Sequence, residues 1–437
     1  MGVGTVMKAR RCILMAWGEN KAVIVQKAIE GDICDQVPAT YLQQHPNTSY
    51  ILEESASTEL TRVKSPWLLH TVDWDEATIK KAVIWLALEL GKPILKLMDR
   101  DYMEHGMGDI ILDQDSAYNI NIRVFKQLQR SITGWPGGKA NVDDKYRPER
   151  ADPPQKRILI FSPHPDDDVI SMGGTFQRLV DQSHHVHTAY QTSGNIAVFD
   201  DDVMRFADFV ADINEGKVPS GEDSLYQRVV KSIRSKKPGD IDTDEVLHIK
   251  ALIRKSEARS ACRFVGVPDE NIHFLNLPFY ETGTVKKRLP GEEDFQIVMN
   301  LITQIKPQQI YAAGDLSDPH GTHRVCLEVI LESIRRLKED GSLHPEECRV
   351  WLYRGAWQEY PIDEIDMAVP LSPDEVTRKR RAIFKHQSQK DTALFPGADP
   401  REFWQRAEAR NAELARQYDL LGLPEYAAIE AFKRYHF

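Results

Sequence analysis

Two short segments of the sequence combine histidine and aspartate at spacings that could hold a divalent metal ion. The residues concerned are His164, Asp166 and Asp167 in segment 162–168, and His320 and His323 in segment 315–323. Three nitrogen or oxygen ligands with an open fourth position are what a catalytic zinc ion requires. Such an ion activates water and polarises a carbonyl, which is the chemistry of hydrolysis. A structural zinc site would need a fourth ligand, usually cysteine, and neither segment contains one.

Each of these segments is expected to follow a buried strand. The run 158–161 is continuously apolar, as in parallel strands that are covered on both faces, and a further strand is expected at 309–313. In open α/β sheets the functional crevice lies beyond the carboxyl ends of the strands. The two segments should therefore meet at one edge of the same sheet.

Further strands and helices are expected to alternate around these two strands. The expected strands are 186–191, 272–275 and 351–354, and the expected helices are 169–180, 249–265 and 324–337. This alternation indicates βαβ units, and hence an α/β fold with a Rossmann-like, mostly parallel sheet and helices on both faces. We expect this domain to span 156–395 and a helical, polar C-terminal extension to occupy 396–437.

The residues before this domain predict a partial α/β module over 1–72 and a helical connector and linker over 73–155. The expected strands are 12–17 and 50–53, and the expected helices are 21–30, 39–44, 56–60, 75–90 and 120–132. Two strands are too few for an independent sheet. We therefore expect this module to expose an apolar edge and to self-associate.

The composition of the 437 residues excludes several classes of protein. With 41% apolar and 28% charged residues, the chain has the balance of a globular protein. A net charge of -10 without a basic block argues against a nucleic-acid partner. No apolar run approaches the roughly 20 residues that span a bilayer, so no membrane partner is expected. Five cysteines without a CxxC pair, and a start unlike a secretory signal, favour a reducing cytoplasm.

The two histidine-containing segments resemble the signature of the PIG-L/LmbE-type zinc-dependent deacetylases, which remove an acetyl group from N-acetylated amino sugars. The matching residues are Pro163-His164-Pro165-Asp166-Asp167 for the HPDD motif and His320-x-x-His323 for the HxxH element. The resemblance extends to Arg254-x-x-Glu257-Ala258 and to His386-Gln387-Ser388-Gln389. It departs from the family at Asp168, where a glutamate is usual.

This resemblance implies roles for individual residues. The implied ligands of a zinc ion, or of another divalent ion, are His164, Asp167 and His323. Asp166 is the implied general base, and His320 would steady the oxyanion or protonate the leaving amine. Arg254 and Ser193 are expected to contact the substrate. For Ser193 the reason is that 192–195 follows a strand at the same sheet edge; the alternative is that this segment is only a turn.

The opening of the chain resembles the C-terminal part of glucosamine-6-phosphate deaminases. The matching stretches are 2–5, 14–22, 42–46 and 57–60. In that family a lysine at this place contacts the sugar phosphate, and the corresponding residue is Lys21. A cation at a helix N-terminus beside a strand end suits an anion. For this chain alone, however, an exposed lysine at a helix start is the safer interpretation. The acid/base loop of that family has no counterpart in this sequence.

The sequence therefore predicts a cytoplasmic zinc hydrolase that removes the N-acetyl group from an N-acetylglucosamine-type amino sugar or a derivative of it. Its substrate would be a small molecule, and a homo-oligomer is left open. Two alternatives remain. One is a glucosamine-6-phosphate deaminase/isomerase-family protein of amino-sugar catabolism, with an incomplete deaminase half. The other is a non-catalytic sugar-binding module.

Overall fold

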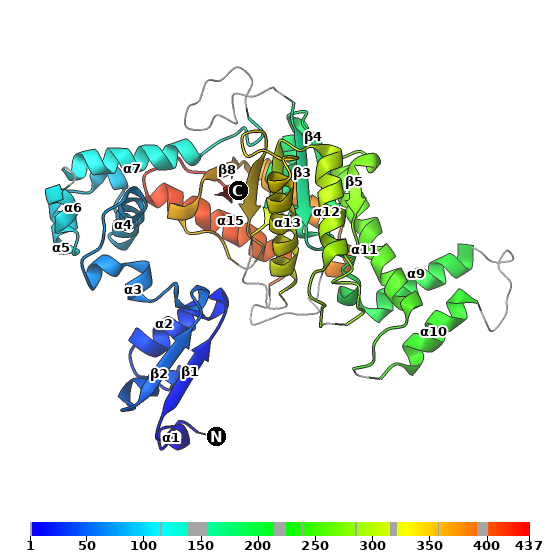
Figure 1. Cartoon of the computed structure of the whole chain (residues 1–437), viewed down its shortest axis with the longest axis horizontal. Coiled ribbons are helices and arrows are strands. Elements are labelled where there is room, and N and C mark those ends of the chain that lie inside the picture. Colours follow the sequence, from blue (N-terminus) through cyan, green and yellow to red (C-terminus); the bar gives the residue numbers. More distant parts are fainter. Residues whose placement is uncertain are drawn as a thin grey trace. The chain divides into compact units, whose positions relative to one another are not determined.

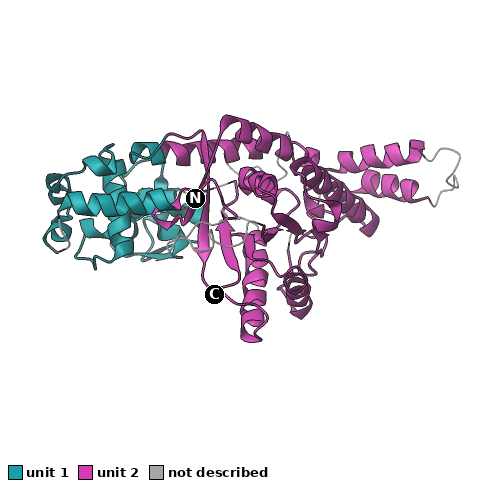
Figure 2. Ribbon diagram, turned by 90° about the horizontal axis from the view of Figure 1, so that it is seen from above, with its two compact units in different colours: residues 1–130, 316–319, 417–424 teal, residues 131–315, 320–416, 425–437 magenta. Residues whose placement is uncertain are grey.

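The computed structural model (Figure 1) describes residues 2–113, 116–138, 155–213, 224–237, 239–284, 286–314, 321–356, 358–390 and 401–437. These residues divide into two compact units (Figure 2). Unit 1 contains the described residues of 1–130 and 417–424, and unit 2 contains those of 131–315, 321–416 and 425–437. Unit 1 thus includes the predicted partial module and the first part of the predicted helical connector. Within the described part of the chain, no helix combines the length and apolarity needed to cross a membrane.

Unit 1 contains a two-stranded parallel sheet followed by helices. Strand β1 (Cys12–Ala16) pairs with β2 (Thr48–Leu52), and α2 (Ala22–Glu30) lies beside them (Figure 1). The remaining α-helices described here are α1 (Val3–Val6), α3 (Thr61–Lys64), α4 (Glu76–Glu89), α5 (Asp99–Glu104), α6 (Gly108–Asp113) and α7 (Ala117–Ser131). In α4 the predicted helical spacing buries Ile79, Val83 and Leu86, and the Asp75 carboxylate caps the helix by accepting from the Thr78 amide.

Unit 2 contains a seven-stranded sheet with the order β5-β4-β3-β6-β7-β9-β8. The strands are β3 (Arg157–Ser162), β4 (His185–Tyr190), β5 (Ile272–Phe274), β6 (Gln309–Ala313), β7 (Arg349–Tyr353), β8 (Met367–Leu371) and β9 (Ala428–Tyr435). Strands β3 to β7 pair in parallel, whereas β9 is antiparallel to both of its neighbours. The predicted fold class, a mostly parallel α/β sheet, is confirmed.

Alternate residues of β3 point to opposite faces of this sheet, and both faces are covered by helices. Ile158 and Ile160 belong to the core on one face, and Leu159 and Phe161 belong to the core on the other. The first core includes residues of α8 (Asp167–Asp181), α11 (Asp244–Val265), α14 (Pro373–Ile383) and α15 (Phe403–Leu420); the second includes α12 (Glu292–Ile305) and α13 (Thr322–Glu339). Burying one such side chain contributes about 1.5–3 kcal/mol, so the strand ends are firmly held. Helices α9 (Asp200–Ile213) and α10 (Leu225–Ser235) form a separate small cluster with α11.

The end of the chain differs from the helical extension predicted for 396–437. Helix α15 fits that prediction, but 428–435 form strand β9, which is inserted between β7 and β8. Strand β8 was not predicted either. In β9, consecutive residues are buried on both faces, so no alternation of apolar and polar residues marks the strand. It also contains a buried charge, Glu430, which is neutralised by Lys379 at 2.7 Å, a partner 51 positions away that no local pattern reveals.

Candidate metal centre

The predicted metal-binding residues follow the carboxyl ends of two neighbouring strands. His164 lies in the loop after β3, and Asp167 is the first residue of α8. Strand β6 pairs with β3, and the next described helix after it, α13, carries His323 in its first turn. Because the two strands are parallel neighbours, segments distant in the sequence meet at one edge of the sheet, as the sequence analysis expected.

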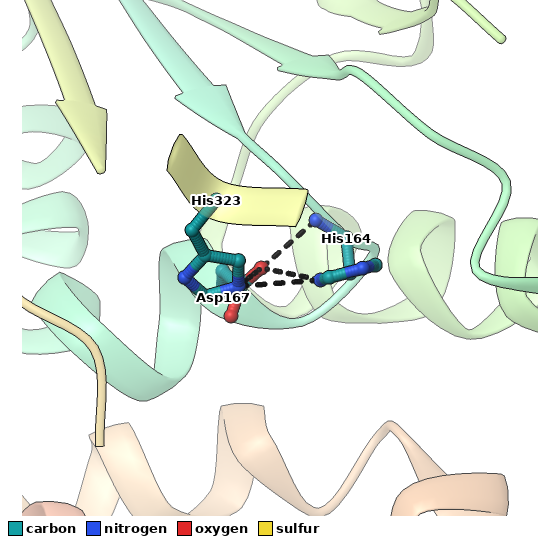
Figure 3. A group of neighbouring side chains, drawn as sticks. All are labelled: His164, Asp167 and His323. Carbon is teal, nitrogen blue, oxygen red and sulfur yellow. Dashed lines mark hydrogen bonds and ion pairs between the residues drawn. The ribbon is translucent and has the colours of Figure 1, made fainter. Parts of the chain in front are cut away.

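His164, Asp167 and His323 converge on one point (Figure 3). Asp167 Oδ2 lies 3.2 Å from His164 Nδ1 and 3.2 Å from His323 Nε2, and the two imidazole nitrogens are 3.3 Å apart. Ligands around a tetrahedral ion, with bonds of about 2.0–2.1 Å, are separated by about 3.3 Å. Two imidazoles and one carboxylate are also donors that zinc and related divalent ions accept. The residues present therefore fit a divalent metal ion.

Local hydrogen bonds hold these donors in place. The His164 amide donates to Asp167 Oδ2 at 2.8 Å. Ser162 Oγ donates to the His164 carbonyl at 2.6 Å and accepts from the Asp168 amide at 3.1 Å, which closes the turn into α8. On the other segment, Gly321 has a φ of 72° directly before α13. Glycine adopts this left-handed conformation without the strain that a Cβ would cause, so it suits the position where the chain turns into the helix.

Two adjacent carboxylates of this turn have opposite electrostatic environments. Burial raises the pKa of Asp166, and the guanidinium of Arg254, with Nη2 3.0 Å from Asp166 Oδ1, opposes part of this shift. For Asp167 burial acts in the same direction, but the imidazoles of His323 and His164 hold its pKa well below the ordinary value. Asp167 is thus suited to bind a cation as a carboxylate, and Asp166 is suited to accept a proton.

The third aspartate of the run, Asp168, points into the protein. It is fully buried and accepts a hydrogen bond from the Tyr190 hydroxyl at 2.8 Å, which also lies 3.2 Å from Cys262 Sγ. Burial raises the pKa of Asp168 to about 7. Asp168, which stands where the family usually has a glutamate, therefore contacts Tyr190 of β4 and is not one of the candidate metal donors.

Residues 159–334 match the family model of PIG-L, which is described as GlcNAc-PI de-N-acetylase. This range contains both segments of the candidate metal centre and the helix α11 that carries Arg254. Residues 159–334 form a PIG-L deacetylase domain. The predicted resemblance is thereby confirmed.

Curated relatives extend the comparison to the whole chain. It is 51% identical to a glucosamine-6-phosphate deaminase-like protein of Bacteroides thetaiotaomicron, over 100% of this chain and 66% of the relative. The N-terminal region matches glucosamine-6-phosphate deaminases, such as that of Rhodopirellula baltica, with 40% identity over 62 residues, which are 14% of this chain and 25% of that enzyme. The chain thus spans about two thirds of the first relative and a quarter of the second.

Among solved structures, the chain is similar to the N,N'-diacetylchitobiose deacetylase of Pyrococcus horikoshii. The identity is 19% and the TM-score 0.42, and the match covers 64% of this chain and 84% of that one. It is also similar to the A40926 pseudoaglycone deacetylase Dbv21, with 16% identity, a TM-score of 0.36, and 64% and 98% of the two chains covered.

Two residues of the PIG-L domain that were predicted to bind substrate make their hydrogen bonds within the protein. Arg254 is 2% exposed, and its Nη2 donates to the Pro165 carbonyl as well as to Asp166. The amide and hydroxyl of Ser193 donate to the Glu281 carboxylate at 3.0 and 2.9 Å. These contacts make Arg254 a positioning residue for Asp166. Contact of either residue with a substrate stays a prediction.

His320 and Lys21 are the remaining predicted site residues. His320 falls in 315–320, outside the described residues. Lys21 belongs to unit 1, where it ends the short 3-10 helix Glu19–Lys21 with an exposed side chain. Its contact with a sugar phosphate stays a prediction.

The sequence analysis missed Tyr280, which packs on His164 of the candidate metal centre. Its ring meets that of His164 edge to face, with the ring centroids 5.9 Å apart, and it is 1% exposed. The ammonium of Lys287 lies 3.5 Å from the Tyr280 centroid. Both residues belong to the irregular segment between β5 and α12. The only local signal for them is that this segment follows a parallel strand at the functional edge.

The two further segments that resemble the family, 254–258 and 386–389, are joined by hydrogen bonds. The amide and hydroxyl of Ser388 each donate to the Glu257 carboxylate at 2.7 Å. These bonds tie the segment after α14 to α11, one turn from Arg254. The two motifs therefore support the helix that orients Asp166.

Proposed function

We propose that the PIG-L domain is a metal-dependent hydrolase that removes the N-acetyl group from an N-acetylglucosamine-type amino sugar or a derivative of it. The observation that carries this proposal is the convergence of His164, Asp167 and His323 inside the range that matches the family. The relatives named for amino-sugar phosphates support the substrate class. A cytoplasmic location is part of the same proposal.

In this proposal His164 Nδ1, Asp167 Oδ2 and His323 Nε2 hold a zinc ion or another divalent ion. When bound, such an ion supplies Lewis-acid polarisation of the amide carbonyl and activation of a water molecule. Asp167 contributes the negative charge of the donor set because its pKa is held low. Two of the three donors, Asp167 and His323, are buried, and His164 is partly exposed, so the set is largely shielded from bulk water.

Asp166 acts as the general base in this scheme. It takes a proton from the attacking water, and a positioned base of this kind contributes about 10²- to 10⁴-fold to the rate. The hydrogen bond from Arg254 holds one carboxylate oxygen and so fixes the direction in which the other faces. After the amide C–N bond breaks, a proton passes to the leaving nitrogen, and acetate and the free amine are released. His320 is the proposed donor of that proton or a partner of the oxyanion.

Acetate release provides the test of this proposal. The full chain is assayed with N-acetylglucosamine, its 6-phosphate and N,N'-diacetylchitobiose, before chelation, after chelation, and after zinc is restored. We expect release from at least one sugar, its loss on chelation and its recovery with zinc. His323→Ala should lose both metal and activity, whereas His273→Ala, at the edge of the same sheet, should retain both. A metal-loaded protein that releases no acetate from any of these sugars contradicts the proposal.

A second candidate is deamination of glucosamine 6-phosphate, which the name of the 51% identical relative favours. Ammonia release, measured in the same samples, distinguishes the two reactions. We expect none, because the acid/base loop of the deaminases has no counterpart in this sequence. A chain that takes up no zinc on titration would instead favour a sugar-binding module.

A further inference from the structure

Lys287 is a partly buried cation beside the candidate metal centre. Its ammonium lies 3.5 Å from the centroid of the Tyr280 ring. The same ring packs edge to face on the imidazole of His164, with the two centroids 5.9 Å apart. A single aromatic ring therefore separates the ammonium from a candidate metal donor. A ligand at the metal centre reaches the ammonium when it extends past this ring.

The charge of Lys287 is not compensated by an anion in direct contact. Among the described residues Lys287 forms no ion pair, and its ammonium donates to the Thr284 carbonyl at 2.7 Å and to the Tyr280 carbonyl at 3.3 Å. Burial lowers the pKa of Lys287 from 10.5 to about 8, and the charge of Glu281 opposes this shift only in part. The Glu281 carboxylate itself accepts hydrogen bonds from Ser193. Burying a charge is unfavourable unless an opposite charge pairs with it, so this position favours an anionic ligand.

The loop that carries Lys287 has two further cations and a defined shape. Lys286 and Arg288 flank Lys287 in the sequence, and both are exposed. The Arg288 amide donates to the Phe279 carbonyl at 3.0 Å, and the Thr284 hydroxyl donates to the Lys286 carbonyl at 2.8 Å. These bonds fold the segment back on itself beside Tyr280. The three positive charges therefore lie together, which strengthens the attraction for an anion.

We propose that Lys287, assisted by Lys286 and Arg288, binds an oxyanion carried by the substrate, either a phosphate or a carboxylate. This inference rests on the proposed deacetylation and narrows its substrate to acidic derivatives of an N-acetylated amino sugar. An ammonium has three N–H donors. Two of them are used by the carbonyls of Thr284 and Tyr280, so one remains for the oxyanion.

A purely structural role is the alternative for Lys287, because its two hydrogen bonds also hold the loop together. In that case loss of the ammonium would disturb the hydrolysis of every substrate alike. Binding of an oxyanion instead predicts a loss confined to acidic substrates, since only these form the ion pair. The ratio of the activities on acidic and neutral sugars separates the two roles.

Paired substrates test the proposal. The metal-loaded full chain is assayed for acetate release from N-acetylglucosamine, its 6-phosphate, its 1-phosphate and N-acetylmuramic acid, which carries a carboxylate. We expect kcat/KM to be at least tenfold higher for one of the three acidic sugars than for the neutral one. Lys287→Gln should remove this preference by raising KM, and Lys287→Arg should retain most of it. Lys338→Gln, at an exposed lysine in the last turn of α13, is the control and should have no effect.

A binding measurement makes the result independent of turnover. Calorimetric titration with the deacetylated forms of the same four sugars should show an acidic sugar that binds wild type at least tenfold more tightly than it binds Lys287→Gln. Lys21→Gln tests whether the sugar phosphate binds in unit 1 instead. Thermal unfolding establishes that each variant is folded.

Three results would overturn the proposal. One is equal kcat/KM for acidic and neutral sugars, and another is an equal loss on both in Lys287→Gln. The third is a calorimetric affinity that disappears in Lys21→Gln but persists in Lys287→Gln. A chain that releases no acetate from any sugar contradicts the proposed deacetylation, and the titration then decides on Lys287 by itself.

Discussion

The two sheets described for this chain both contain parallel, apolar strands, but in very different surroundings. In unit 2, β3 lies between two parallel partners, and its residues Ile158 and Ile160 are fully buried. In unit 1, β1 has one partner, and Ile13 and Met15 are about half exposed. Apolar strand residues therefore stabilise a sheet only when other layers cover them. The comparison also explains why the candidate metal centre can be held precisely at the end of β3.

The largest expected effect concerns catalysis at the candidate metal centre, at the edge of the large sheet of unit 2. Asp166→Asn should lower kcat for acetate release by about 10²- to 10⁴-fold, because the amide cannot accept the proton from water. Metal content, measured by elemental analysis, should stay at the wild-type level, since Asp166 is not among the three donors. Glu54→Gln, an exposed carboxylate after β2 in the small sheet, is the control and should not change the rate. A wild-type rate in Asp166→Asn would show that another group is the base.

A smaller effect is expected in stability, and it compares the two sheets directly. Ile160→Ala should lower the free energy of unfolding of unit 2 by about 2–5 kcal/mol, because it leaves a cavity between two packed layers. Ile13→Ala should change that of unit 1 by no more than about 0.5 kcal/mol, since the side chain already faces solvent. Urea unfolding followed by hydrogen exchange of the amides in each sheet measures both. Equal losses of free energy in the two variants would mean that the Ile13 side chain is covered in solution.

The smallest effect is a pH dependence at the outer edge of the large sheet. His187 Nδ1 on β4 lies 3.1 Å from His273 Nε2 on β5. Burial, with His273 beside it, lowers the pKa of His187 from 6.5 to about 4. The unfolded chain therefore takes up a proton that the folded state refuses. The free energy of unfolding should decrease as the pH falls from about 6.5 to about 4.

His187→Gln should make this decrease shallower without removing it, because burial also lowers the pKa of His184 to about 4 and that of His386 to about 3. Thermal unfolding between pH 7 and pH 4 measures the slope. An unchanged slope in the variant would show that this histidine pair does not contribute to acid sensitivity.

The sequence by itself identified the candidate metal donors and the elements that carry them. An imidazole or a carboxylate is recognisable from its residue type, and the apolar run 158–161 identifies a covered strand because its pattern is local. In a parallel sheet the loops that follow neighbouring strands lie at the same edge, so the order of the strands predicts which loops meet. Strand β9 escaped the same reasoning because Glu430 interrupts its apolar pattern, and the charge that neutralises it comes from Lys379.

Only the tertiary structure decided how the side chains of the site differ from one another. Asp166 and Asp167 are adjacent and chemically identical, yet the first faces Arg254 and the second faces two imidazoles. It also shows that Arg254 is buried and donates a hydrogen bond to Asp166, a contact that the sequence analysis did not predict. Charge–charge interactions and burial act through space between residues far apart in the chain, so spacing along the sequence carries no record of them.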